Sequence, residues 1–268
     1  PLYVDKDGIT IAFLNFAENE YNTATDKHGG ANPMDLIDNV RQIAEAKKNS
    51  DFVFVVIHGG IDYCRYPSPR MVKQYRFYAE QGASAIIGHH SHVVSGYEVY
   101  KNVPIFYGIG SLIPGKLVTE ECKYGFPVLF EINKGNKISF KGFPIKYDYN
   151  ANRLELLKGE EQKIFEKKQQ EVNVTLGDEK ALKQKILEEF LSKERRSYYY
   201  TLFTRTNYFK FKLFRKVGLI NFFYESMRRK MKINPKYTVT WNLIRCETHR
   251  DVLGLLYENV FDKYTNQD

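Results

Sequence analysis

Four of the six histidines in the chain lie in two short segments, which contain His58 and the group His89, His90 and His92. Imidazole nitrogen binds zinc, iron, nickel and similar divalent ions, so this grouping points first to metal chemistry. Side chains alternate along an extended backbone, so His90 and His92 would face the same side and could share one ion or flank two. The alternative is a hydrogen-bonded structural role, which is the usual one for a lone histidine. The grouping of four favours a metal site.

The segments before these histidines have the composition of buried strands. Residues 9–16 are β-branched and aromatic, residues 52–57 are apolar at every position, and residues 85–87 form a shorter apolar run. Continuous apolar runs of this kind are typical of a parallel sheet that is covered on both faces. His58 follows the second run directly, and His89 lies just after the third. The histidines are therefore predicted at strand ends.

Two helices are predicted between these strands. The first opens at Pro33 and ends near Asn49, with an apolar stripe made by Leu36, Ile37, Val40, Ile43 and Ala44. The second is capped by Ser68 and ended by Gly82, with four inward residues, Val72, Tyr75, Tyr78 and Ala79. Right-handed crossovers place the loops after both strands at one edge of the sheet, where open α/β sheets hold their ligands. We therefore expect His58, His90 and His92 to converge on one cavity.

The pattern changes after residue 97. Four short strand-like runs, 97–100, 105–109, 128–132 and 138–140, alternate with turns and predict an antiparallel section. Two later stretches, 153–170 and 179–197, have the Glu and Lys spacing of helices. We place a domain boundary near residue 150, between an α/β domain over 1–150 and a helical, basic region over 151–268.

Two motifs around the histidines resemble those of a known family. Residues 57–63, Ile-His-Gly-Gly-Ile-Asp-Tyr, and residues 87–96, Ile-Gly-His-His-Ser-His-Val-Val-Ser-Gly, resemble the HWG-x-EY and GHHPHV…G motifs of the CapA, or poly-gamma-glutamate synthesis, family. Their order and spacing also match. Residues 105–112 resemble the I-x-YSLGN-F segment that follows in this family, and residues 241–256 resemble a C-terminal helix of some capsule-locus members. The resemblance is strong over about residues 8–148 and patchy afterwards.

The resemblance implies an α/β fold of the calcineurin-like metallophosphatase kind. This chain would supply the C-terminal portion of a four-layer α-β-β-α sandwich, followed by a mostly helical C-terminal region. The family's Asp-bearing GD turn and its NNH segment come earlier than the matching region. We therefore expect the carboxylates that complete the metal site to precede Pro1, which begins the chain without a methionine or a signal-like segment.

Carried over by position, the resemblance makes three residues metal ligands, namely His58, His90 and His92. Asp62 stands where the family has glutamate, Gly59 where it has tryptophan, and Ser111 where it usually has asparagine. Asp62 and His89 are candidate catalytic groups, since Asp62 could orient a histidine or act as a base. Arg65 and Ser111 are candidates for binding substrate, and Arg65 suits an anion. A surface role is the alternative for Asp62 and Arg65.

The function that follows is a metal-dependent hydrolase or transfer enzyme in the synthesis of a capsular polysaccharide or a poly-gamma-glutamate-type polymer. Its cofactors would be divalent ions such as Zn, Mn, Fe or Ni, and its substrate an anionic polymer or a phosphoryl compound. The alternative is a non-catalytic binding or assembly factor. Such a factor would keep a partial metal site and dock polymer or membrane through a basic region.

The positive charge of the chain is concentrated in one segment. Residues 193–237 hold 13 Lys or Arg, 2 Glu and 12 Phe or Tyr, so this segment carries +11 and the rest −3, against +8 for all 268 residues. Such a segment favours an anionic membrane or polymer, with a solvated helix face as the alternative. Specific nucleic-acid binding is not expected, because no nucleic-acid-binding motif accompanies the charge.

Composition restricts the class of protein. The chain is 43% apolar and 27% charged, as ordinary globular domains are, and has no uninterrupted apolar stretch of the ~20 residues that a membrane span needs. Its three cysteines, Cys64, Cys122 and Cys246, form neither a C-x-x-C pair nor an even disulfide framework, which fits a reducing compartment. We expect a location in the cytoplasm or at the periphery of the membrane.

Overall fold

The computed structural model describes residues 1–20, 23–115, 119–133, 135, 137–191 and 245–255. The chain divides into two compact units, one made of Pro1–Glu18 and Asn22–Lys185 and the other of Asn19–Tyr21 and Ile186–Asp268. The basic segment 193–237 lies outside the described residues, so the prediction that it docks to membrane or polymer stays a prediction.

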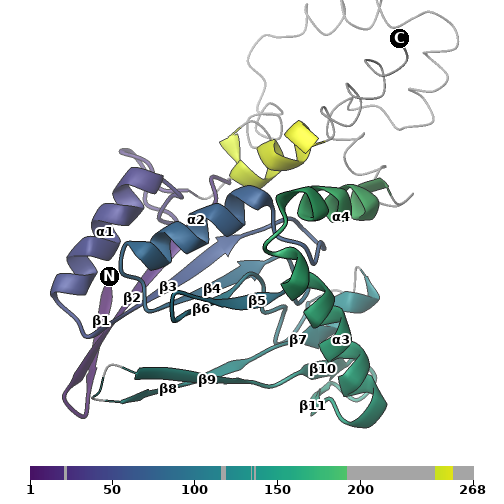
Figure 1. Cartoon of the computed structure of the whole chain (residues 1–268). Coiled ribbons are helices and arrows are strands. Elements are labelled where there is room, and N and C mark those ends of the chain that lie inside the picture. The colour runs from purple at the N-terminus through teal and green to yellow at the C-terminus, as the bar shows by residue number, and fades with distance from the viewer. Residues whose placement is uncertain (21–22, 116–118, 134, 136, 192–244, 256–268) are drawn as a thin grey trace, which may run out of the picture. The chain divides into compact units, whose positions relative to one another are not determined.

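The first unit is built on a six-stranded sheet with the order β1-β2-β3-β4-β6-β5 (Figure 1). Its strands in chain order are β1 (Leu2–Lys6), β2 (Ile9–Ala17), β3 (Phe52–Gly59), β4 (Ala85–His90), β5 (Tyr97–Tyr100) and β6 (Val103–Phe106). The four central strands run parallel, whereas β1 and β5 pair antiparallel at the two edges. The predicted parallel sheet is confirmed. β5 and β6 extend it, although the sequence placed them in a separate antiparallel section.

Two helices, α1 (Leu36–Lys48) and α2 (Pro69–Glu80), cover one face of this sheet (Figure 1). Inward residues of the strands pack against them, as the Phe16 ring does at 5.7 Å from the Tyr78 ring. Ser68 caps α2 by accepting a hydrogen bond from the Met71 amide at 3.2 Å, and the four residues predicted to face inward are all buried. The sequence prediction for α2 is confirmed.

The prediction for α1 was wrong in its start and in its buried stripe. The helix begins at Leu36 because the Asp35 side chain accepts hydrogen bonds from two first-turn amides, so Pro33 lies outside it. The buried residues of α1 are Asn39, Ile43 and Ala46, whereas Leu36 and Ile37 are exposed. A polar residue faces inward because Asn39 Nδ2 donates to the Tyr78 hydroxyl at 2.9 Å.

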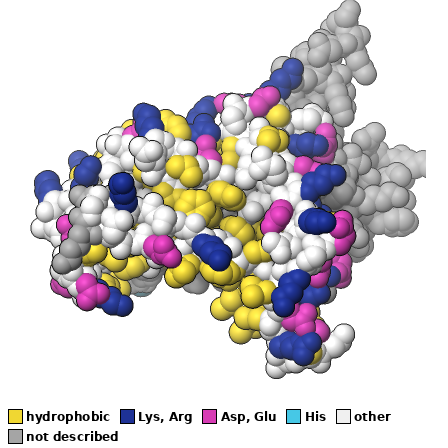
Figure 2. Space-filling model, turned by 60° about the horizontal axis from the view of Figure 1, so that its bottom comes forward, with side chains coloured by type: hydrophobic (Ala, Val, Ile, Leu, Met, Phe, Trp, Pro, Cys, Tyr) yellow, Lys and Arg dark blue, Asp and Glu magenta, His cyan; other side chains and the backbone are white. Residues whose placement is uncertain are grey.

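The opposite face of the sheet is covered in part by a hairpin of β8 (Val128–Asn133) and β9 (Lys137–Gly142). Phe130 of the hairpin packs edge-on against Phe54 of β3, with ring centroids 5.1 Å apart, and Phe54 packs on Phe13 at 5.5 Å. Ile9, Ile11 and Phe13 on this face stay only half-buried. Figure 2 turns the hairpin side of the molecule toward the viewer and shows hydrophobic side chains gathered at the surface.

A small sheet and a long helix complete the first unit. The sheet has the order β11-β10-β7 and consists of β7 (Tyr124–Gly125), β10 (Ile145–Asp148) and β11 (Arg153–Leu156). It is preceded by a short 3₁₀ helix (Glu120–Lys123) and followed by α3 (Gly159–Thr175). The next helix, α4 (Glu179–Leu191), begins in the first unit, which ends at Lys185. The helix predicted from residue 153 begins only at Gly159, because residues 153–156 pair with β10 in a hairpin. The domain boundary near residue 150 stays a prediction.

The second unit contains a helix over 247–255, in the region that resembles a C-terminal helix of capsule-locus members. Glu247 at its start is buried and accepts two hydrogen bonds from Asn19, one from the backbone amide at 2.9 Å and one from the side-chain amide at 2.7 Å. Within the described ranges, every helix is too short or too polar to span a bilayer.

Candidate metal centre

The two histidine segments end neighbouring strands at one edge of the sheet. In the parallel register of β3 and β4, His58 lies opposite His89 and Gly59 lies opposite His90. Because side chains alternate along a strand, His58 and His89 extend from the same face as Phe54 and Ala85. This is the face that the hairpin leaves half-covered.

The structure brings the four imidazoles together. The ring centroid of His58 lies 4.5 Å from that of His90 and 5.0 Å from that of His89, and the rings of His90 and His92 are 5.7 Å apart. The three predicted ligands therefore lie around one place, as the shared strand edge predicts. Their role as metal ligands stays a prediction.

The backbone that achieves this is not the extended one that the His-x-His spacing suggested. His90 and His92 have φ angles of 120° and 59°, and Tyr63 in the facing loop has 57°. Positive φ costs a residue with a side chain of the order of 1–3 kcal/mol and persists only where the surroundings hold it. Here the Tyr63 amide donates to the Ser91 carbonyl at 2.8 Å, and the Tyr63 ring stacks on His92. The two histidine loops thus fix each other in conformations typical of functional sites.

Asp62 lies within the cluster and is placed as a ligand candidate. Its Oδ1 is 3.4 Å from Nε2 of His90 and 3.9 Å from Nε2 of His92. One ligand atom from each of these three residues lies within 4.8 Å of the others. Ligands at ~2.1 Å from one zinc ion lie at most ~4.2 Å apart, so a small closure would let the three share an ion. The sequence suggested Asp62 as a base or an orienting group, and the geometry also allows it to bind an ion directly.

His89 differs from the other three histidines in its electrostatics. Burial, followed by the nearby imidazoles of His58, His90 and His92, lowers the pKa of His89 to about 4. The ring is therefore neutral near pH 7, with one nitrogen that donates and one that accepts a hydrogen bond. With a pKa of about 4 the ring is a weak base near pH 7, so the catalytic role predicted for His89 stays a prediction.

Comparison with known proteins identifies this part of the chain. Residues 1–116 match the family model described as bacterial capsule synthesis protein PGA_cap. The predicted resemblance to the CapA family is confirmed for residues 1–116.

Two curated CapA proteins match over nearly the same length. The PGA biosynthesis protein CapA of Bacillus subtilis (strain 168) is 35% identical over 113 residues, which are 41% of this chain and 30% of that protein. The capsule biosynthesis protein CapA of Bacillus anthracis is 33% identical over 118 residues, which are 42% of this chain and 29% of that protein. An uncharacterized protein of Sinorhizobium fredii is 33% identical over 91 residues, or 33% of this chain and 20% of that protein. The match thus spans less than a third of each relative's length.

Glu18 lies next to the histidine cluster and was not among the site residues predicted from the sequence. Its side chain is only 2% exposed and forms an ion pair with Arg70 of α2 at 2.6 Å. Its carboxylate also accepts a hydrogen bond from the Gly60 amide at 3.2 Å, and its own amide donates to the His58 carbonyl at 2.9 Å. Glu18 therefore anchors the loop that carries His58. The signal that could have found it is its position just after a strand of the parallel sheet.

The same carboxylate accounts for a departure from the CapA motif. A Cβ atom on Gly59 would lie 2.9 Å from both Cγ and Cδ of Glu18, closer than such atoms can approach. Gly59 stands where the motif has tryptophan, and here the Glu18 side chain occupies the space next to it. A larger residue at this position would force Glu18 out of its ion pair.

The structure gives less information about Arg65 and Ser111, the predicted substrate-binding residues, than about the histidines. The Arg65 carbonyl accepts a hydrogen bond from the Ser95 hydroxyl, which ties the loop after β3 to the segment after the histidines. Ser111 follows Gly110, which forms an isolated β-bridge with Gly125. Their role in binding substrate stays a prediction.

Proposed function

We propose that this chain carries the histidine half of a metal-dependent hydrolase or transfer centre that serves capsular polysaccharide or poly-gamma-glutamate-type polymer synthesis. The polymer class is supported by the relatives, which are named for capsule and PGA biosynthesis. The metal centre is supported by one observation above all, namely that Asp62, His90 and His92 offer ligand atoms within 4.8 Å of one another. The His58 ring, 4.5 Å from that of His90, adds a further nitrogen donor.

The donor set suits a borderline divalent ion. Imidazole nitrogens with one carboxylate oxygen are ligands of zinc, iron, manganese or nickel, whereas calcium and magnesium prefer oxygen alone. When bound, such an ion would polarise a phosphoryl or carbonyl oxygen and make bound water acidic. Asp62, His90 and His92 would hold it, and the neutral His89 ring would orient the bound water by a hydrogen bond. Glu18 keeps the His58 loop in place from behind.

The four-layer sandwich is part of this proposal. A second sheet would pack on the half-covered face of the first, over Ile11, Phe13 and Val56, which are only half-buried. Its strand ends would then meet the histidine edge and could bring the carboxylates that bridge two ions. The partial exposure of this apolar face supports the arrangement, because covering these side chains would stabilise the protein.

The test is metal binding by equilibrium dialysis with Zn²⁺, Mn²⁺, Fe²⁺ and Ni²⁺, followed by a phosphodiesterase assay. We expect weak binding of about one ion, because few carboxylates compensate its charge. The double variant His58→Ala/His90→Ala should bind at least about tenfold more weakly, as the loss of ligand groups requires. His28→Ala is the matched control, since His28 is an exposed histidine in a polar loop. Equal binding by the double variant and the control would refute the metal centre.

A second candidate is a non-catalytic assembly factor that binds an anionic polymer or membrane. The charge of +11 on residues 193–237 favours it. The triple variant Arg228→Gln/Arg229→Gln/Lys230→Gln should then bind acidic vesicles or anionic glycan less tightly at low salt. Metal binding without turnover, together with this loss, would favour the assembly factor over the enzyme. Unchanged adsorption would leave the basic segment as a solvated surface.

A further inference from the structure

A groove of about 360 Å³ runs along α3, and none of the histidines lines it. One wall is polar and comes from α3, with Gln162, Glu166, Gln169, Gln170 and Asn173. The floor is aromatic and includes Tyr97, Phe126 and Phe140. A volume of this size lies at the lower end of the range of small-molecule sites, about 300–1,000 Å³.

The floor of the groove is a rigid set of aromatic rings. The Tyr97 ring stacks on Phe126 with centroids 6.1 Å apart, and Phe140 meets it edge-on at 5.7 Å. Tyr97 and Phe140 are only half-buried, so part of this apolar surface faces the groove. Flat, partly exposed aromatic rings bind ligands that have an apolar face of their own.

The polar wall keeps hydrogen-bonding capacity beyond its internal contacts. Gln162 Nε2 donates to Glu166 at 2.7 Å, and Gln169 Nε2 donates to the Ser95 carbonyl at 3.4 Å. Each primary amide offers two donors and two acceptor positions, and these bonds use only one of the four in each residue. The wall can therefore both donate to and accept from hydroxyl groups of a ligand.

The charge of the groove selects against an anion. Its lining contains one carboxylate, Glu166, and neither Lys nor Arg. A chain of glutamates would meet a like charge here and no cation to compensate it. A neutral sugar would meet amide partners for its hydroxyls and aromatic rings for its C–H face.

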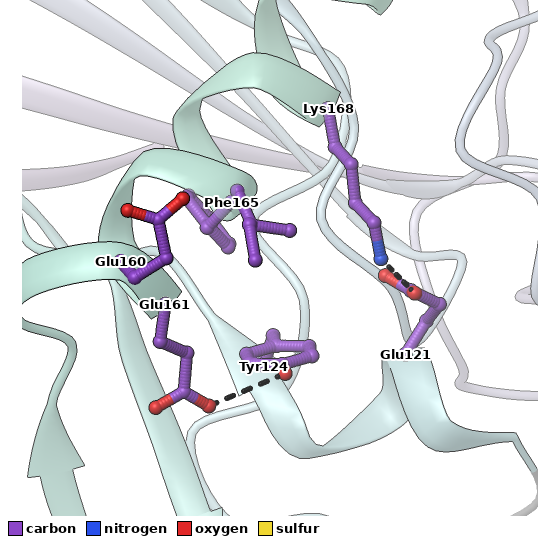
Figure 3. Close-up of a pocket in the computed structure, with 7 residues that line it drawn as sticks. Glu121, Tyr124, Glu160, Glu161, Phe165 and Lys168 are labelled. Carbon is purple, nitrogen blue, oxygen red and sulfur yellow. Dashed lines mark hydrogen bonds and ion pairs between the residues drawn. The ribbon is translucent and has the colours of Figure 1, made fainter.

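In a neighbouring cavity the charged side chains already pair with one another. This cavity of about 190 Å³ is lined by three glutamates, but the chain balances their charge itself (Figure 3). Lys168 pairs with Glu121 at 2.5 Å, and Glu161 pairs with Lys146 at 2.8 Å and accepts from the Tyr124 hydroxyl at 3.4 Å. Its polar groups are used within the fold, so this cavity carries no proposal.

The groove also contacts the segment that follows the histidine loop. Asn173 Oδ1 accepts a hydrogen bond from the Tyr97 amide at 2.7 Å, while Gln169 holds the Ser95 carbonyl. Gly96 between them leaves room for this approach, because a Cβ there would lie 2.7 Å from Asn173 Oδ1. A ligand in the groove would therefore meet Tyr97, five residues beyond His92.

We propose that this groove binds one or two units of a neutral saccharide chain. The proposal deepens the proposed function, since it assigns the polymer contact to a glycan, but it does not depend on the metal. The groove would hold a glycan beside the loop that carries the histidines, and it would exclude polyglutamate from this position. The amide wall would supply most of the contact area and fix the hydroxyl pattern, while the exposed edge of the aromatic floor would meet the C–H face of a sugar.

The experiment is ligand-observed NMR on the full chain with maltotetraose, cellotetraose and chitotetraose, against γ-linked tetraglutamate as the anionic competitor. We expect a neutral tetrasaccharide to bind with a dissociation constant of about 1 mM, as suits a shallow groove. The variant Gln162→Leu/Gln170→Leu removes two amides and keeps the aromatic floor, and it should weaken binding about tenfold, or ~1.4 kcal/mol. Lys167→Leu is the control, because Lys167 is exposed on the same helix and does not line the groove.

Three outcomes would overturn the proposal. The first is equal glycan binding by the double-amide variant and the control, and the second is tighter binding of tetraglutamate than of the glycans. The third is the absence of binding by all three neutral tetrasaccharides at ligand concentrations well above ~1 mM. Repeating the titration with His58→Ala/His90→Ala separates this result from the metal centre. Glycan binding should persist in this variant although metal binding is lost. Failure of the parent chain to bind any glycan would leave the result of the metal titration unaffected.

Discussion

The two faces of the six-stranded sheet are built from the same strands but differ in how completely they are buried. On the face under α1 and α2, Leu14 is 1% exposed and Ile57 is 0% exposed. On the other face, Ile9, Ile11 and Phe13 are half-buried beside the hairpin of β8 and β9. His58 and His89 extend from this second face at its edge. The covered face therefore closes the core, whereas the other face leaves apolar side chains partly exposed next to the histidine edge.

The largest expected effect comes from matched deletions in β2, one on each face. Leu14→Ala should lower the free energy of unfolding by about 2–5 kcal/mol, because it leaves a cavity in a closed core. Ile11→Ala removes a similar number of carbon atoms from a half-exposed site and should cost about 1–2 kcal/mol, since part of that surface already meets water. Urea unfolding of the two variants measures the difference. Equal losses would show that the two faces are packed alike.

The covered face also supports the histidine loop, through the ion pair of Glu18 and Arg70. Arg70→Met should cost about 2 kcal/mol of stability, less than a fully buried pair because Arg70 is 27% exposed. The loop anchored by Glu18 should loosen as well, so Zn²⁺ affinity should fall about tenfold, as for other residues that orient ligands.

Lys48→Met is the control for this pair. It breaks a surface pair with Glu45, whose side chains are 74% and 62% exposed, and such pairs contribute at most about 1 kcal/mol. A loss of stability without any change in Zn²⁺ affinity would mean that Glu18 serves the covered face alone.

The sequence predicts the covered face better than the half-covered one, for a physical reason. Residues 52–57 are apolar at every position, which predicts two buried faces, and nothing local distinguishes Val56 from Ile57. Which face is closed depends on elements far along the chain, namely α2 and the β8–β9 hairpin. The strand edge and the helix capped by Ser68 were predictable, because both depend on local patterns.

The missed features are those that depend on partners. β11 carries charged residues, was predicted as part of a helix, and is a strand because β10 pairs with it. The buried stripe of α1 was misplaced because Asn39 hydrogen-bonds to Tyr78 across the packing surface. Asp62 was found as a chemical group, but its place between His90 and His92 follows from positive φ angles that spacing cannot indicate.

Within the half-covered face, Asp62 should matter for metal affinity and little for folding. Asp62→Asn removes the negative charge that faces His90 and His92, so Zn²⁺ affinity should fall about tenfold, or ~1.4 kcal/mol. Asp62→Glu should keep most of the affinity, since the CapA motif has glutamate at this position. Calorimetric titration with Zn²⁺ compares the two. If the Asp62→Asn and Asp62→Glu variants bind Zn²⁺ equally well, Asp62 is a surface residue and does not belong to the ligand set.

The smallest expected effect is the pH dependence that His89 gives to the half-covered face. Its pKa is lowered to about 4 by burial and the neighbouring imidazoles, whereas an unfolded chain has a value near 6.5. Between these values the unfolded state binds the proton and the native state does not, so stability is lost as pH falls from about 6.5 to 4. Above pH 6.5 both states are neutral and the contribution is flat. Because the ring is partly exposed, we expect a loss of only about 1 kcal/mol.

His89→Asn should reduce this acid slope, measured by urea unfolding from pH 7 to pH 4 in the presence of a chelator. His28→Asn should leave the slope unchanged, because His28 is exposed and lies outside the cluster. Were both variants to keep the slope, the imidazoles of the half-covered face would be solvated enough to titrate as in the unfolded chain. Desolvation at the strand edge would then be too weak to lower the pKa of His89, and its ring would not stay neutral between pH 4 and pH 6.5 as the structure indicates.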